Sequence, residues 1–105
     1  MTLDQLRSFL LVARCGSFTR AAEELCLTQP AVSAQVAALE REYDACFLDR
    51  IGKRLEVTEA GRAVVAAAED IQRRVDQLDE ELRDLEGLKR GRIRLGASLI
   101  VGIYL

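Results

Sequence analysis

Apolar and polar residues alternate with a helical period over the first 43 positions. A first helix is predicted from apolar side chains that follow steps of three and four along the chain, namely Leu6, Phe9, Leu10 and Ala13. Thr2 and Gln5 have the spacing of a capping box at its start, and Gly16 can end it in the left-handed conformation. A short second helix is expected after Ser17 or Thr19.

A third helix is predicted from Thr28, a good capping residue, followed by proline in the first turn, where its missing N–H costs nothing. Its core stripe is expected to be Val32, Val36, Leu39 and Tyr43. The opposite face has mostly short side chains, and we call it the bare face; it carries Pro30, Ala34, Ala37, Ala38 and Arg41. Alanine favours helices, so helix propensity alone can explain this face; short side chains also let a helix lie deep in the major groove of DNA. The pattern leaves both readings open.

After Asp44 the pattern changes to that of short strands. Residues 46–50 and 55–57 are strand candidates on either side of a glycine-containing turn, which predicts a β-hairpin. The stretch 46–58 contains two acidic side chains and three basic ones, the latter being Arg50, Lys53 and Arg54. Two helices separated by a tight turn and followed by a basic hairpin predict a winged helix-turn-helix.

Thr58 is expected to cap the last and longest helix, which is predicted over residues 59–86. Its apolar residues follow the a/d seam of a coiled coil: Val64, Ala68, Ile71, Val75, Leu78, Leu82 and Leu85. The early part of this seam, near Gly61 and Val65, can pack against the chain's own first helix. Beyond Val75 we expect the seam to form a homodimer.

The predicted fold is mainly α, a three-helix core plus a β-hairpin wing followed by a long helix. Four parts are expected. Residues 1–58 form the winged helix-turn-helix, 59–86 a linker and dimerisation helix, and 87–91 a hinge that breaks this helix. Residues 92–105 are expected to be the front edge of a second domain that is otherwise absent.

Composition narrows the function classes. The chain has 105 residues, of which 50% are apolar and 30% charged, the balance of a folded protein. Apolar runs stay below the roughly 20 residues that span a bilayer, and the start does not resemble a secretory signal, so we expect a cytoplasmic protein without a membrane partner. The sequence has no histidine and no phosphate-cradling glycine loop, so we predict no catalytic residue and no cofactor, and do not expect an enzyme.

The three cysteines leave open an alternative role, and the net charge leaves open an alternative function class. Cys15, Cys26 and Cys46 form no C-x-x-C pair, which disfavours a metal site or a disulfide framework. We interpret them as reduced packing residues, with a redox-sensing role as the alternative. The net charge of −2 by itself disfavours a nucleic-acid binder, and with the long seam it keeps a protein–protein module built on the coiled coil as the alternative function.

The order of these pieces resembles the LysR-type bacterial transcriptional regulators over residues 1 to about 97. The resemblance is carried by GSFTRAAEEL (16–25), LTQPAVSAQVAALE (27–40), FLDR (47–50), GKRLEVTEAG (52–61) and GRIRLGAS (91–98). It implies double-stranded operator DNA as the partner and a homodimer through the linker helix, with a tetramer in the full-length protein. A small-molecule effector would bind only through the missing C-terminal domain, and Ser98 falls where family members often begin to contact this ligand.

By position, the resemblance implies a DNA-binding set on the third helix and the wing: Thr28, Gln29, Pro30, Ser33, Ala34, Gln35, Arg50, Lys53 and Arg54. Thr28 would cap the helix and offer its hydroxyl to a phosphate. Gln29 and Ser33 would meet base edges while thymine methyls pack on Pro30 and Ala34. The wing cations would reach the backbone or the minor groove.

The sequence departs from the family pattern at several positions. Many members carry arginine where this chain has Ala34, Ala37 and Ala38, which excludes an arginine–guanine contact from those positions. Asp44 replaces a common glycine after the third helix, and Phe-Leu at 47–48 replaces the usual Leu-Phe. We expect the last two departures to alter the local turn and core without changing the fold.

Overall fold

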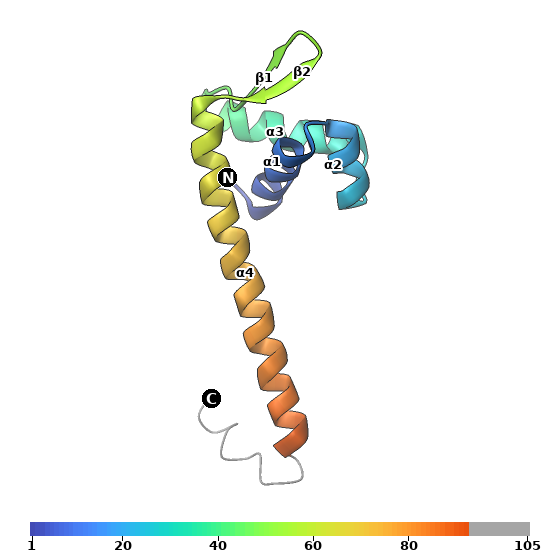
Figure 1. Cartoon of the computed structure of the whole chain (residues 1–105), viewed down its shortest axis with the longest axis vertical. Coiled ribbons are helices and arrows are strands. Elements are labelled where there is room, and N and C mark those ends of the chain that lie inside the picture. The colour runs from blue at the N-terminus through green and yellow to red at the C-terminus, as the bar shows by residue number, and fades with distance from the viewer. Residues whose placement is uncertain (93–105) are drawn as a thin grey trace. The chain divides into compact units, whose positions relative to one another are not determined.

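The computed structural model describes residues 1–92, with side chains for residues 1–87. The elements follow the order α1 (Leu3–Cys15), α2 (Phe18–Leu25), α3 (Gln29–Tyr43), β1 (Leu48–Ile51), β2 (Arg54–Val57) and α4 (Glu59–Arg92) (Figure 1). This order confirms the predicted fold class, a mainly α winged helix-turn-helix followed by a long helix. Residues Met1–Gln72 make one compact unit, and a second begins at Arg73, so the first unit extends beyond the boundary predicted at residue 58.

Helix starts lie where the capping residues predict them. The Thr2 hydroxyl accepts the Gln5 N–H at 3.0 Å, while the Gln5 side chain accepts the Thr2 N–H at 3.1 Å, which is the predicted capping box. Of the two candidates for α2, Ser17 is the cap, and Thr28 caps α3. Gly16 ends α1 with φ +67°, a conformation that glycine adopts without strain.

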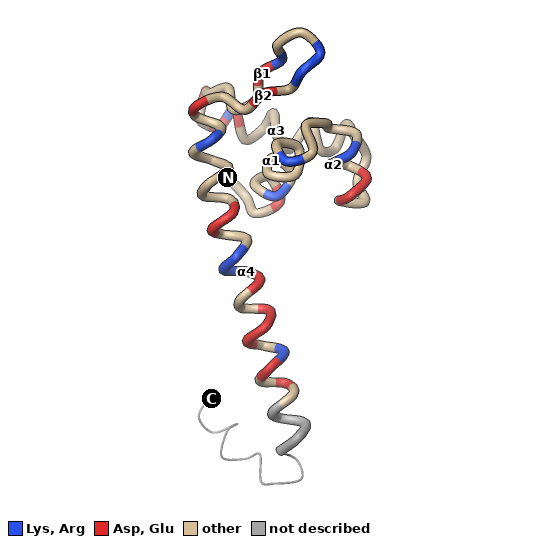
Figure 2. The backbone as a smooth tube through the Cα atoms, viewed as in Figure 1, with Lys and Arg blue, Asp and Glu red and all other residues tan. Residues whose placement is uncertain are grey.

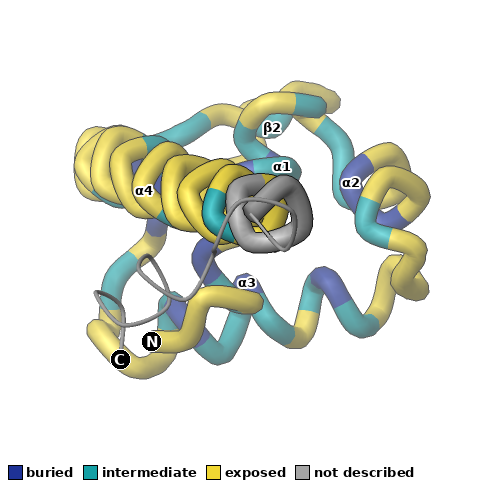
Figure 3. Tube along the Cα trace, turned by 90° about the horizontal axis from the view of Figure 1, so that it is seen from below, coloured by how far each residue is buried: buried dark blue, intermediate teal, exposed yellow. Residues whose placement is uncertain are grey.

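Helices α1, α2 and α3 pack around one core, which Phe47 and the early part of α4 complete (Figure 3). The rings of Phe9 and Phe47 meet edge to face, with centroids 5.9 Å apart and an interplanar angle of 67°. The buried apolar side chains are Leu6, Phe9, Leu10, Val12, Ala21, Ala22, Val32, Val36, Leu39, Phe47, Leu48 and Ala68. The core therefore holds α3 through the inner stripe predicted for it, with one exception.

The exception is Tyr43, whose placement in the core stripe was a wrong prediction, because the residue is 49% exposed. Tyr43 is the last residue of α3, and Asp44 then turns the chain in the left-handed conformation (φ 48°) that glycine commonly supplies there. The tyrosine hydroxyl hydrogen-bonds Glu42, which raises the pKa of Tyr43. A hydrogen bond from the N-terminal ammonium holds the pKa of the Glu42 carboxyl below its usual value.

The wing is an antiparallel hairpin in which Leu48 pairs with Val57 and Ile51 with Arg54. Gly52, with φ +65°, supplies the left-handed residue of the turn. The first strand starts at Leu48 and not at the predicted residue 46. Phe47 makes only one of the two bonds of a ladder pair: its carbonyl accepts the Thr58 N–H at 3.0 Å, but its own N–H donates to a Glu40 carboxylate oxygen at 2.7 Å, and the Thr58 carbonyl accepts the Arg62 N–H instead.

Helix α4 starts at the predicted cap but ends later than predicted. The Thr58 hydroxyl accepts the Gly61 N–H at 3.0 Å and donates to the Cys46 carbonyl at 2.6 Å. The predicted break at residues 87–91 is wrong, because α4 continues to Arg92. A single glycine costs a helix only about 1 kcal/mol relative to alanine. The predicted break contains two glycines, Gly87 and Gly91, and the leucine, lysine and arginine between them are good helix formers. Residues 93–105, including Ser98, lie outside the described residues.

The apolar seam of α4 divides into a covered and an exposed part. Val64 and Val65 pack against the core, and Ala68 is only 3% exposed. Nearby, Arg14 of α1 pairs with Glu69 at 3.2 Å. The assignment of Ala68 to a dimer seam is therefore wrong, since its own chain already covers it. Beyond it the exposed fractions are 37% for Ile71, 47% for Leu78 and 54% for Leu82, with Val75 and Leu85 half-buried.

Candidate nucleic-acid interface

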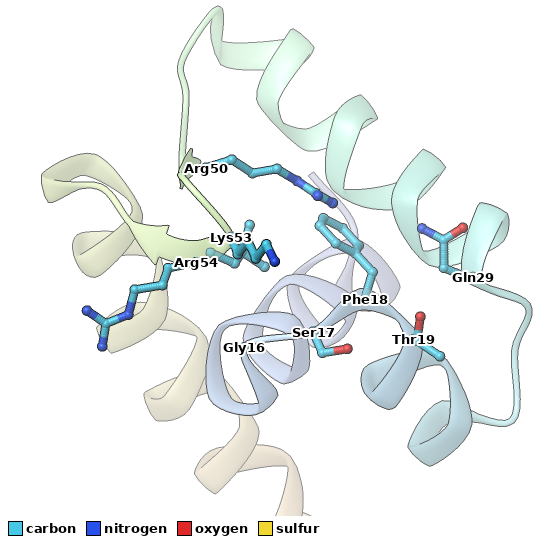
Figure 4. Close-up of a pocket in the computed structure, with 9 residues that line it drawn as sticks. Gly16, Ser17, Phe18, Thr19, Gln29, Arg50, Lys53 and Arg54 are labelled. Atoms are coloured by element: carbon cyan, nitrogen blue, oxygen red, sulfur yellow. The ribbon is translucent and has the colours of Figure 1, made fainter.

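A hollow of about 210 Å³ opens between the α1–α2 turn, the start of α3 and the wing (Figure 4). Its lining residues are Gly16, Ser17, Phe18, Thr19, Gln29, Arg50, Lys53, Arg54 and Leu55. The structure thus brings the three predicted wing cations to the same hollow as Gln29, although about twenty residues of sequence separate them from it.

The side chains of the wing cations point in different directions. In Figure 4, Arg50 extends from β1 toward Phe18 and α3, and Lys53 lines the same hollow from the turn of the wing. The guanidinium of Arg54 points the other way, out from the wing. Arg50 and Lys53 can therefore serve one anionic group in the hollow, whereas Arg54 is placed to meet a different one.

The hollow is electropositive although the whole chain is slightly acidic. The basic residues Arg50, Lys53 and Arg54 line it with Ser17 and Thr19, although the guanidinium of Arg54 points outward, and no acidic residue in the described part of the chain does so. Figure 2 shows basic residues on the wing, together with one acidic residue on each of its strands, Asp49 and Glu56, and further acidic residues at the far end of α2, where Glu23 and Glu24 lie. A cation-lined surface of this kind attracts phosphate, so the net charge of −2 does not describe this face.

The start of α3 presents most of the residues predicted to contact DNA. Thr28, Gln29, Pro30 and Ala34 are exposed, and Ser33 is half-buried. The amide nitrogen of Gln29 donates to the Ser33 hydroxyl oxygen at 2.8 Å. This bond steadies the glutamine along the helix, and the serine O–H can still donate to an acceptor such as a base edge.

Gln35 is placed apart from the other predicted contact residues. The hydroxyl of Ser8, which is buried on α1, donates to the Gln35 side-chain oxygen. Gln35 is half-buried and turns its side-chain oxygen toward α1, so its contact with DNA stays a prediction. A buried hydroxyl needs a hydrogen-bond partner, so the serine within the apolar stripe of α1 was a signal that sequence reasoning could have used.

Glu40 is a second residue whose role the sequence did not reveal. One of its carboxylate oxygens accepts the N–H of Phe47 at 2.7 Å and that of Leu48 at 3.3 Å. The carboxylate thereby ties the C-terminal half of α3 to the base of the wing. These partners lie seven and eight residues along the chain, beyond the end of α3 at Tyr43, so the helical period does not extend to them and could not point to them.

The prediction that the cysteines are packing residues is wrong for Cys26 and Cys46, because both are exposed. Cys26 ends α2 with φ 56°, and the thiol of Cys46 donates to the Leu48 carbonyl at 2.9 Å. Cys15 is half-buried; burial, and then the neighbouring Glu24, raise the pKa of its thiol, which favours the unreactive protonated form.

Among residues 1–92, no helix has the length and apolar character to cross a membrane.

Known proteins share both the sequence and the fold of this chain. It is 47% identical over 103 residues to the HTH-type transcriptional activator CmpR of Synechocystis sp., covering 98% of this chain and 34% of that protein. It is 43% identical over 104 residues to the RuBisCO operon transcriptional regulator of Allochromatium vinosum, covering 99% and 34%. The chain thus spans about a third of the length of these relatives, which are transcriptional regulators and not enzymes.

Solved structures of DNA complexes have the same fold. The BenM DNA-binding domain bound to catB site 1 DNA gives a TM-score of 0.76 at 32% identity, covering 82% of this chain and 96% of that one. Full-length CbnR complexed with its target DNA gives 0.70 at 31% identity, covering 79% and 29%. Residues 3–62 match the bacterial regulatory helix-turn-helix family named after lysR. The winged helix-turn-helix described above therefore belongs to the LysR family of bacterial regulators.

Proposed function

We propose that this chain is the DNA-binding part of a transcriptional regulator and that it binds duplex operator DNA in the cytoplasm. The observation that carries the proposal is the hollow in which Arg50 and Lys53 lie with Gln29 at the start of α3. An electropositive hollow beside the exposed start of a helix suits a phosphate backbone that runs next to a major groove.

In this proposal α3 enters the major groove with its bare face. Pro30 and Ala34 are exposed and short, so they can pack on thymine methyls, and the linked Gln29 and Ser33 can read neighbouring base edges. Thr28 caps the helix and can offer its hydroxyl to a phosphate at the positive end of the helix dipole. Arg50 and Lys53 then bind the backbone in the hollow, and Arg54 meets the backbone or the minor groove outside it.

The exposed part of the α4 seam supports a homodimer. Ile71, Leu78 and Leu82 are exposed, and Val75 and Leu85 complete the a/d spacing around them. Two copies would read two half-sites, as dimeric helix-turn-helix proteins do. A tetramer and a small-molecule effector would mainly involve the two thirds of the relatives' length that this chain does not span, with Ser98 where contact with the effector would begin.

The test is fluorescence anisotropy of the chain on random duplex DNA between about 50 and 200 mM salt. Counterion release makes the logarithm of the affinity fall linearly with that of the salt concentration, with a slope of about −0.9 for each phosphate neutralised. Arg50→Ala should weaken binding to every sequence and reduce the steepness of this slope by about 0.9.

Arg83→Ala is the matched control, because it removes the same charge from an exposed residue of α4 that does not line the hollow. An unchanged slope in Arg50→Ala would remove the wing from the interface. A stable dimer with no affinity for duplex DNA at any salt would favour the protein–protein module instead.

A further inference from the structure

We infer that Glu40 is a positioning residue for DNA binding, because its carboxylate holds the base of the wing to α3 and so sets where Arg50 and Lys53 stand relative to the start of that helix. The inference rests on the proposed function. It assigns to an acidic residue, which by its charge should repel DNA, a requirement for binding DNA.

The carboxylate of Glu40 joins α3 to the start of β1. A single oxygen of Glu40 accepts two adjacent backbone N–H groups, from Phe47 at 2.7 Å and Leu48 at 3.3 Å. Both donors belong to buried residues, and Glu40 itself is half-buried. Hydrogen bonds to a charged acceptor are stronger than neutral ones, and leaving two buried N–H groups without a partner is costly.

The two N–H donors lie at the base of the wing. Leu48 is the first residue of β1 and its one buried residue; from Asp49 to Ile51 the strand is exposed. On the other strand, Thr58 fixes the end of the hairpin through its bonds to Cys46 and Phe47. The wing is thus held at its base, and Glu40 supplies the side-chain hydrogen bonds from α3 to the start of β1.

The base of the wing sets the direction of the hairpin that carries Arg50 and Lys53. Arg50 lies two residues beyond Leu48 on β1, and Lys53 lies in the turn. A two-stranded hairpin has little stability of its own, so its direction depends on its attachment. If the attachment loosens, the wing cations sample more positions and binding must order them at an entropic cost.

The test separates positioning from charge. Glu40→Gln removes the charge and keeps one oxygen that can accept both N–H groups, whereas Glu40→Ala removes the charge and the acceptor. Loss of a negative charge near DNA favours binding, so Glu40→Gln should bind at least as tightly as the wild type. Glu40→Ala should bind about tenfold more weakly at about 100 mM salt, and its slope should be shallower by about 0.9 for each lost phosphate contact.

Glu23→Ala is the charge-matched control, because it removes a carboxylate from an exposed position on α2. It should bind like the wild type or slightly more tightly. Wild-type affinity in Glu40→Ala would overturn the inference. If circular dichroism shows that Glu40→Ala does not fold, Glu40→Asp replaces it, since it keeps the charge one methylene too short; it should then bind more weakly than Glu40→Gln.

A double-mutant cycle excludes a merely structural role. If Glu40 acts through the wing, Arg50→Ala should cost much less in the Glu40→Ala background than in the wild type. Additive losses would overturn the inference. If Arg50→Ala alone leaves the affinity and the slope unchanged, the proposed wing contact fails before the role of Glu40 is tested, so the two failures can be told apart.

Discussion

The two parts of α4 carry the same apolar spacing in opposite surroundings. Within the compact unit that ends at Gln72, Val64 packs on the core and Ala68 is buried in it. From Arg73 on, Leu78 and Leu82 continue the same seam and are exposed. Steps of three and four therefore define an apolar stripe on a helix without defining what covers it. In the first part the covering comes from the chain's own core, and in the second we propose another copy of the chain.

The largest expected effect comes from Gly61→Ala, in the covered part. A Cβ at Gly61 would lie 2.1 Å from the Phe47 carbonyl oxygen and 2.7 Å from a methyl carbon of Val57. Either α4 or the base of the wing must shift to accommodate it. We expect unfolding to become easier by about 3 kcal/mol. Thermal melting followed by circular dichroism should show a midpoint lower by roughly 12–24 °C.

Gly87→Ala is the control in the exposed part, because a Cβ there would have no atom within 4 Å. It should leave the melting of the first unit unchanged or strengthen α4 by about 1 kcal/mol, the helix propensity difference between glycine and alanine. Equal melting curves for the two alanine variants would contradict the close packing of α4 on the wing.

A smaller effect, on assembly and not on folding, is expected for Leu82→Ala. The variant removes one leucine side chain from each copy, and at about 1 kcal/mol or more for each partly covered side chain the dimer should lose about 2 kcal/mol or more, which raises its Kd about thirtyfold. Sedimentation equilibrium measures this constant. Glu80→Ala, at an exposed position on the side of α4 opposite the seam, should leave it unchanged. A wild-type dimer in Leu82→Ala would show that the exposed part of the seam is not the dimer contact.

The smallest effects are expected from the ion pairs in the two parts. Arg14 and Glu69 are 3.2 Å apart, and Arg74 and Glu81 are 3.6 Å apart, and all four side chains are well exposed. Solvent and salt screen such pairs. Arg14→Ala and Arg74→Ala should each change stability by less than about 0.5 kcal/mol in urea titrations. A loss above about 1 kcal/mol for Arg14→Ala would show that its ion pair is a main link between α1 and α4.

The correct sequence predictions rest on signals that lie within a few residues of one another. Thr2, Thr28 and Thr58 cap helices through backbone groups three residues away, and the turn glycine of the wing lies beside the basic residues that it presents. Caps and turns are decided by local dihedral preferences and short-range hydrogen bonds. For this reason the helix starts and the cation-bearing tip of the wing could be predicted.

The missed features depend on partners that lie far along the chain. Gln35 turns inward because Ser8, on another helix, needs an acceptor, and Ala68 is covered by a core assembled from other elements. Tyr43 has the period of the core stripe but sits where α3 ends. The wing cations and Gln29 likewise line one hollow only because the tertiary fold brings the wing and the start of α3 together. Periodicity gives a residue its face on a helix but not its neighbours on other elements.

Thr58 and Gly61 have a practical consequence for chimaeric regulators. The most natural splice point by sequence is the end of the wing at residue 58, yet the junction extends a full helical turn further: the Thr58 hydroxyl joins Cys46 to Gly61, and Gly61 leaves room for the Phe47 carbonyl. A foreign helix grafted after residue 58 would have to bring glycine as its third residue. A transplantable cassette should instead run to Gln72, so that the graft is made outside the compact unit.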